Sequence, residues 1–61
     1  MKKTALSGLK VGDLFRLSDN EKFPLWVRDT YLRKGKYLIY QYDNVNKFKE
    51  TDGKRFVFVE D

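Results

Sequence analysis

The residues best suited to chemistry lie between Trp26 and Tyr42, where aromatic and cationic side chains are interleaved. The set comprises Trp26, Arg28, Arg33, Lys34, Lys36, Tyr40 and Tyr42. Aromatic rings exposed on a β-sheet can stack on nucleic-acid bases, and neighbouring lysines and arginines can contact the phosphates. The sequence therefore predicts a basic and aromatic binding surface, with nucleic acid as the first candidate partner.

A second group of the same kind lies closer to the end of the sequence. It comprises Lys47, Lys49, Lys54, Arg55, Phe56 and Phe58. If Asp52 and Gly53 close a hairpin, the two phenylalanines lie opposite the two lysines of the preceding strand. Core packing is the stronger interpretation of both phenylalanines, because their rings lack a polar group that could remain in contact with water. Core packing is also the favoured interpretation of Trp26.

The composition excludes the common catalytic constellations. The chain has no histidine and no cysteine, so neither a Ser–His or Cys–His pair nor an ordinary zinc site can be built. Its glycines are isolated and do not form a phosphate-binding loop. The sequence thus predicts a protein that is not an enzyme and that uses no metal and no cofactor.

The carboxylates need separate consideration, because they could serve acid–base chemistry or hold magnesium. Asp13 and Asp52 lie beside glycine in turn sequences, which explains them without a catalytic role. Asp29 is different, because it stands in mid-strand among valine and tyrosine residues. We expect it to pair with Arg28, Arg33 or a tyrosine hydroxyl, or to face solvent.

The net charge favours an anionic partner. The 61 residues include 13 lysines and arginines against 9 aspartates and glutamates, which gives a formal charge of +4 and a pI near 9.5. Such a charge attracts nucleic acid by electrostatic steering and by release of counterions. It is also ordinary for a small protein, so it indicates a partner only together with the aromatic residues.

The predicted binding residues belong to a hairpin. Segments 25–32 and 36–42 are rich in aromatic and β-branched residues, and Arg33, Lys34 and Gly35 stand between them. Glycine at the end of a three-residue loop suits a turn that closes with a left-handed residue.

The faces of this hairpin depend on its register. A three-residue loop pairs Arg28 with Tyr40 and Trp26 with Tyr42, so that these four side chains share one face. A two-residue loop shifts the pairing by one residue and redistributes the second strand between the two faces. Aromatic residues occupy both faces in either case, and one small core cannot cover them all.

Three further segments, 14–17, 47–51 and 55–59, have the composition of strands and are bounded by turn residues. We therefore expect residues 1–61 to form a single all-β domain with little or no helix and with residues 1–4 flexible. A strongly bent, five-stranded antiparallel sheet or an SH3-like barrel would cover both faces. An open sheet completed by dimerisation is the alternative, since the last segment is apolar on both faces.

The sequence contains nothing that resembles a membrane span of about 20 apolar residues. The apolar run after Met1, Lys2 and Lys3 is also too short for a signal peptide. The absence of cysteine fits a reducing compartment. We expect a soluble, cytoplasmic protein with no membrane partner.

Several short motifs follow one another as in a group of short, free-standing bacterial proteins of unassigned function. The matching residues are Val11-Gly12-Asp13 with Phe15, Trp26-Val27-Arg28, Tyr31 with Arg33, Tyr37, and Asp43-Asn44-Val45-Asn46. The chain resembles these proteins over most of its length, and the resemblance implies a complete small protein with an SH3-like β-barrel pattern. It implies no catalytic residues, because the chemistry of the group is itself unassigned.

A protein-interaction module is the second class of function. Tyrosine, tryptophan and arginine are enriched at binding hot spots, and an exposed sheet edge can pair with a partner strand or a second copy. Phosphate binding weakens steeply as salt rises, whereas an apolar interface changes little. We expect a non-enzymatic binding protein, with nucleic acid placed ahead of a protein partner or a homodimer.

Overall fold

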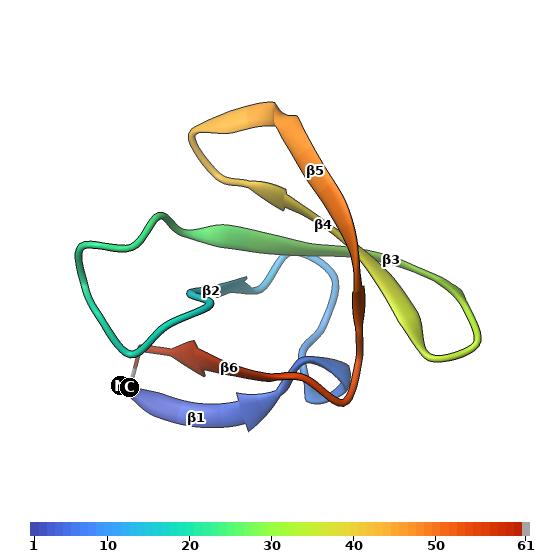
Figure 1. Ribbon diagram of the computed structural model, residues 1–61, viewed down its shortest axis with the longest axis horizontal. Helices are drawn as coiled ribbons and strands as arrows, with labels where there is room; N and C mark the ends of the chain where they lie inside the picture. The colour runs from blue at the N-terminus through green and yellow to red at the C-terminus, as the bar shows by residue number, and fades with distance from the viewer. Residues whose placement is uncertain (61) are drawn as a thin grey trace.

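The computed structural model describes residues 1–60, and strands make up most of it (Figure 1). The elements in chain order are β1 (Lys2–Ala5), the 3-10 helix η1 (Leu6–Gly8), β2 (Leu14–Phe15), β3 (Trp26–Arg33), β4 (Lys36–Gln41), β5 (Asn44–Asp52) and β6 (Phe56–Val59). All strand pairs are antiparallel. The prediction of an all-β protein is confirmed.

The strands form two sheets that meet at one point. β2, β3, β4 and β5 form a four-stranded sheet in that order, and β1 pairs with β6 in a second sheet. An isolated bridge joins them, because the backbone N–H of Arg16 donates to the oxygen of Phe58 at 2.8 Å and the reverse bond is 2.9 Å. Within residues 1–60 the sheets do not close into a barrel, and there are six strands where the sequence pattern predicts five.

The additional strand is β1, which lies where the sequence indicates a flexible end. Its residues pair with β6 from Lys2 opposite Val59 to Ala5 opposite Phe56 (Figure 1). β6 is apolar on both faces and needs a neighbour along its edge, so it orders a segment that has little strand propensity of its own.

The hairpin of β3 and β4 turns through two residues, with Arg33 opposite Lys36. Both turn residues have positive φ, 53° at Lys34 and 75° at Gly35. This is the backbone of a type I′ turn, whose twist matches that of the flanking strands. Of the two loop lengths considered from the sequence, the two-residue loop of Lys34 and Gly35 is therefore the one that the structure contains.

The register then drifts along β3. Two irregularities, one on each side of Tyr31, each shift the pairing by one residue. The register expected from a three-residue loop is found only at the pair of Tyr31 and Tyr37. The expected pair of Arg28 with Tyr40 is wrong, because Arg28 faces Ile39. The expected pair of Trp26 with Tyr42 is also wrong, because Gln41 faces that tryptophan.

Asp52 and Gly53 do not close a hairpin, contrary to the prediction. β5 pairs with β4, and β6 pairs with β1, so this pair of residues forms a corner between the two sheets. The backbone N–H groups of Leu6 and Ser7 donate to the oxygens of Arg55 and Gly53, both at 2.9 Å, and hold the corner against η1. A turn signal specifies a change of direction but not which strand the chain joins next.

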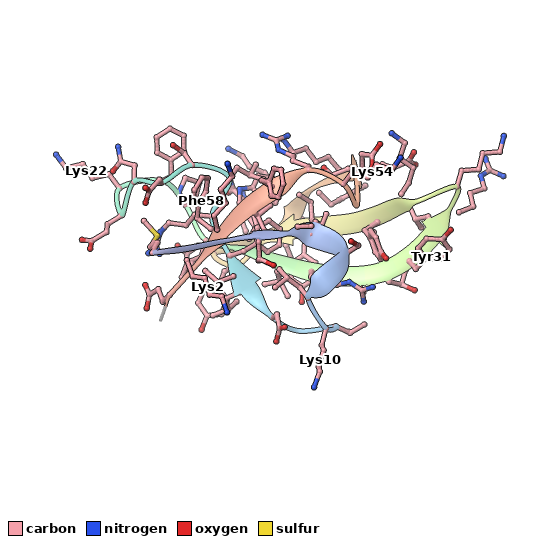
Figure 2. All side chains as sticks on the ribbon, turned by 90° about the horizontal axis from the view of Figure 1, so that it is seen from below. Lys2, Lys10, Lys22, Tyr31, Lys54 and Phe58 are labelled. Atoms are coloured by element: carbon pink, nitrogen blue, oxygen red, sulfur yellow. The ribbon has the colours of Figure 1, made fainter. Side chains whose placement is uncertain are left out.

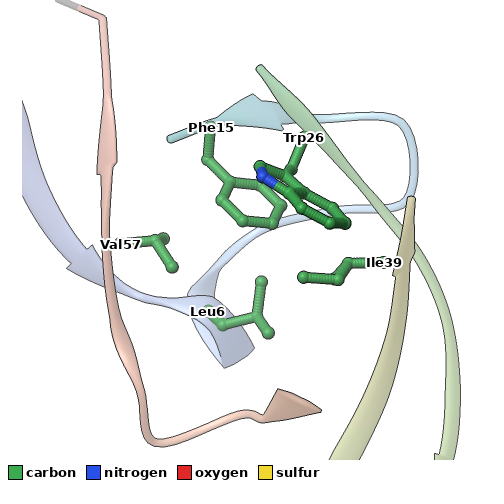
Figure 3. Packing of buried hydrophobic residues seen from close by; sticks show 5 residues of the cluster. All are labelled: Leu6, Phe15, Trp26, Ile39 and Val57. Atoms are coloured by element: carbon green, nitrogen blue, oxygen red, sulfur yellow. The ribbon is translucent and has the colours of Figure 1, made fainter. Parts of the chain in front are cut away.

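The core takes one residue from each of five elements. Figure 3 shows Leu6, Phe15, Trp26, Ile39 and Val57 packed together, none of them more than 8% exposed. Burying each such side chain stabilises the fold by about 1.5–3 kcal/mol relative to exposure.

Among the described residues no helix has the length and apolar character needed to cross a membrane.

Candidate functional site

The structure divides the predicted binding residues between two faces of the sheet. Trp26 and Arg28 lie on the face that carries the core residue Ile39, whereas Tyr40 lies on the opposite face with Val27. The expected common face is therefore not formed. The reason is that Arg28 and Trp26 pair with β4 one residue away from the expected register, and a shift of one residue exchanges the two faces.

Trp26 is a core residue and not an exposed stacking platform. Only 8% of it is accessible, and the Nζ atom of Lys49 lies 5.1 Å from the centroid of its ring. Tyr42 is 57% exposed in the turn between β4 and β5, away from the tip of the β3–β4 hairpin. Neither ring can act together with the cations of that tip.

The fold instead brings an additional cation, Lys54, to the hairpin tip. The backbone N–H of Gly53 donates to the oxygen of Gly35 at 2.7 Å, which fastens the corner between the sheets to the turn. As a result, Lys34 and Lys54 line the same shallow pocket of about 310 Å³, together with the hydroxyl-bearing Ser7. Sequence reasoning assigned these two lysines to separate candidate surfaces.

Tyr37 also lines this pocket, and Tyr31 and Arg28 both contact its ring. Tyr31 is 51% exposed and packs edge to face on Tyr37, with 5.1 Å between the ring centroids and 68° between their planes. The Tyr31 hydroxyl accepts a hydrogen bond from the Gly35 N–H at 3.1 Å. The guanidinium carbon of Arg28 lies 4.4 Å from the centroid of Tyr37, an arrangement that favours a cation over the ring face.

We name this assembly the tip surface and define it by its residues. They are Arg28, Tyr31, Lys34, Tyr37 and Lys54, with the exposed Arg33 next to them at the turn. In Figure 2, Tyr31 and Lys54 lie toward the hairpin end of the molecule, and Lys22 lies at the opposite end. The sequence indicated Arg28, Arg33 and Lys34, but no local signal connected them to Tyr31, Tyr37 or Lys54.

One carboxylate, Asp52, also lines the pocket, and it is already engaged. Its Oδ2 lies 3.7 Å from the Nζ of Lys36, and its Oδ1 accepts the backbone N–H of Lys54 at 2.8 Å. The Lys54 N–H, followed by the charges of Lys36 and Lys54, lowers the pKa of Asp52 below its ordinary value of 3.8. Asp52 is thus ionised at neutral pH and offsets Lys36, which leaves Lys34 and Lys54 without a salt bridge among residues 1–60.

The close approach of the corner to the tip makes a specific demand on Gly53. A Cβ at this position would lie 3.0 Å from Cδ1 of Tyr37 and 3.2 Å from the oxygen of Gly35, and closer still to Cε1 of Tyr37. We expect Gly53→Ala to lower the free energy of unfolding by about 1–3 kcal/mol, because the ring or the corner must move. Urea unfolding followed by circular dichroism measures this change.

Gly8→Ala is the matched control, since its Cβ would meet only Oγ1 of Thr4, at 3.4 Å. That contact is ordinary, so the variant should remain within about 1 kcal/mol of the parent. Equal stability of the two alanine variants would contradict the close packing of the corner on the tip.

Another pocket contains none of the predicted binding residues between Trp26 and Tyr42. Its volume is about 370 Å³, and Phe15, Phe58 and Glu60 are among its lining residues. Arg16, which also lines it, forms a salt bridge with Glu60 at 3.0 Å. No cluster of three potential metal ligands occurs in the described part of the chain.

Comparison with known proteins adds no assignment. No protein-family model matches the chain, and no curated protein or solved structure is similar to it at a significant level.

Proposed function

We propose that this protein binds single-stranded nucleic acid through the tip surface. The observation that carries the proposal is the contact of Gly35 with Gly53, which places Lys54 beside Lys34 at the turn whose Gly35 N–H bonds to the exposed Tyr31. Cations around an exposed aromatic ring are the combination that single strands require, since phosphates and unstacked bases are both accessible. A duplex would offer phosphates and the base edges in its grooves, but no free base face on which Tyr31 could stack.

Each part of the surface has a role in this proposal. Lys34, Lys54 and Arg33 contact phosphates, and the exposed part of Tyr31 stacks on a base. Tyr37 packs edge to face on Tyr31 at 5.1 Å, and Arg28 in turn lies over Tyr37 at 4.4 Å. A supported ring loses little conformational freedom on binding, which favours affinity.

The proposal extends to fold type and location. We regard the two sheets joined at the Arg16–Phe58 bridge as an open variant of an SH3-like barrel, supported by the antiparallel order of β2 to β5. A cytoplasmic protein would meet single-stranded nucleic acid directly. The resemblance to short bacterial proteins of unassigned function is compatible with this role and does not specify it.

The test is a titration of a fluorescein-labelled, mixed-sequence 12-nucleotide DNA strand, followed by anisotropy at several salt concentrations. With three phosphate contacts, log K should fall against log[salt] with a slope of about −2, since single strands contribute about −0.7 per contact. Absence of binding at about 50 mM salt, or an affinity that does not change up to about 200 mM, would rule out the proposal.

A further inference from the structure

The outer face of the four-stranded sheet, which faces away from the core, carries an apolar row that crosses all four strands. Leu14 pairs with Val27, Val27 with Tyr40, and Tyr40 with Phe48. Directly paired residues point to the same side of a sheet, so these four residues share one face. Val27 is only 5% exposed, whereas Leu14 and Phe48 are 42% and 65% exposed, so the accessible apolar surface lies at the two ends of the row. A solvated face of an antiparallel sheet usually carries polar residues, and this one is therefore suited to contact a partner.

A groove lies at the β5 end of this row. It has a volume of about 330 Å³ and is lined by Asp29, Leu38, Tyr40, Val45 and Phe48. Val45 and Phe48 are 66% and 65% exposed, although both are large apolar residues. The groove thus has an aliphatic part and two neighbouring aromatic rings.

Asp29 is the single charged residue among those that line the groove. Its Oδ1 accepts the backbone N–H of Thr30 at 2.8 Å, and no lysine or arginine of residues 1–60 lies within salt-bridge distance of it. Of the alternatives expected from the sequence, the ion pairs with Arg28 and Arg33 are not formed, and Arg28 lies on the core side over Tyr37. An uncompensated carboxylate therefore borders an apolar groove in a protein whose net charge is +4.

We propose that this groove binds a lysine side chain of a partner protein. The aliphatic stem of lysine would lie on Leu38 and Val45, in the way that long cationic side chains cover apolar surface. Its ammonium group would reach the Asp29 carboxylate between Tyr40 and Phe48, whose rings attract cations. The groove thus complements both the apolar stem and the charged end of one side chain.

The other occupants fit less well. Nucleic acid would bring phosphates to Asp29, which repels them. A second copy presenting the same groove would bury two Asp29 carboxylates without adding a cation from the lining residues, and unpaired buried charges are costly. This inference does not depend on the tip surface, because the groove lies on the opposite face of the hairpin.

The test uses amide NMR spectra of the ¹⁵N-labelled protein titrated with acetyl-Ala-Leu-Lys-Leu-Ala-amide. The matched probe replaces lysine with norleucine, which keeps the stem and removes the charge. We expect the lysine peptide to shift the amides of residues 29, 38, 40, 45 and 48, and to bind at least about fivefold more tightly than the norleucine peptide.

Asp29→Asn should remove this difference, and its Oδ1 can still accept the Thr30 N–H, so the fold is retained. Its binding to the 12-nucleotide strand should persist, which separates the groove from the tip surface. Equal affinity for the two peptides, or shifts confined to other residues, would overturn the inference. Concentration-dependent shifts of the groove amides without peptide would also overturn it, because the occupant would then be a second copy.

Discussion

Replacing Phe15 with alanine is expected to leave most molecules unfolded in water at 25 °C. Phe15 is 1% exposed and is the largest fully buried side chain of the core (Figure 3). Truncating a buried phenylalanine costs about 3–5 kcal/mol. A single small core of this size rarely supplies more than about 3–5 kcal/mol in total, and no disulfide is present to add to it. Circular dichroism of the variant, with and without urea, measures the loss.

Phe48→Ala is the matched control, because it removes the same side chain from the outer face, where 65% of it is exposed. We expect its unfolding midpoint to stay close to that of the parent protein, within about 0.5 kcal/mol. If both variants unfold to the same extent, the assignment of the core to the inner face of the sheet is wrong.

The second large effect concerns binding. The double variant Lys34→Glu, Lys54→Glu should weaken binding of the 12-nucleotide strand by about 100-fold and reduce the salt slope by about one to two units, because two phosphate contacts become repulsive. Both side chains are on the surface, so the circular dichroism spectrum should not change. Fluorescence anisotropy at two salt concentrations provides both quantities.

Lys10→Glu, Lys22→Glu is the control with the same total charge. Each substitution changes the charge by two units, so both double variants carry a formal charge of 0 instead of +4. Lys22 lies at the end of the molecule opposite the hairpin, and Lys10 lies below the sheets in Figure 2. If the two double variants lose affinity equally, binding depends on net charge and the tip surface is not the site.

Local patterns predicted the strand segments and turns better than they predicted the pairing of strands. The β-rich segments around Lys34 and Gly35 do form a hairpin, and five of the six strands occupy segments close to those expected at 14–17, 25–32, 36–42, 47–51 and 55–59. The corner at Asp52 and Gly53 was misassigned, because a turn sequence is compatible with both a hairpin and a change of sheet. β1 was not predicted, because its residues have little strand propensity of their own and form a strand by pairing with β6.

For the candidate binding residues, too, local sequence indicated the residue types but not which residues the fold brings together. Trp26 has the composition expected of a stacking ring, yet it completes the core, because it pairs with the buried Phe15 and shares the face of Ile39. Tyr31 and Lys54 were not grouped with Lys34, because no local signal shows that Gly53 will bond to Gly35. Asp29 was identified as unusual from the sequence, but its lack of a cationic neighbour follows only from the face on which Arg28 lies.

The sequence by itself determined that the protein is all-β, that the chain reverses at Lys34 and Gly35, and that no histidine or cysteine chemistry is present. These properties depend on composition and on φ preferences, which act within a few residues. The tertiary structure alone decided the register of the hairpin, the partner of β6 and the meeting of Lys34 with Lys54. Such features depend on how five distant residues fill one core, and a shift of a single residue is enough to exchange the two faces of a strand.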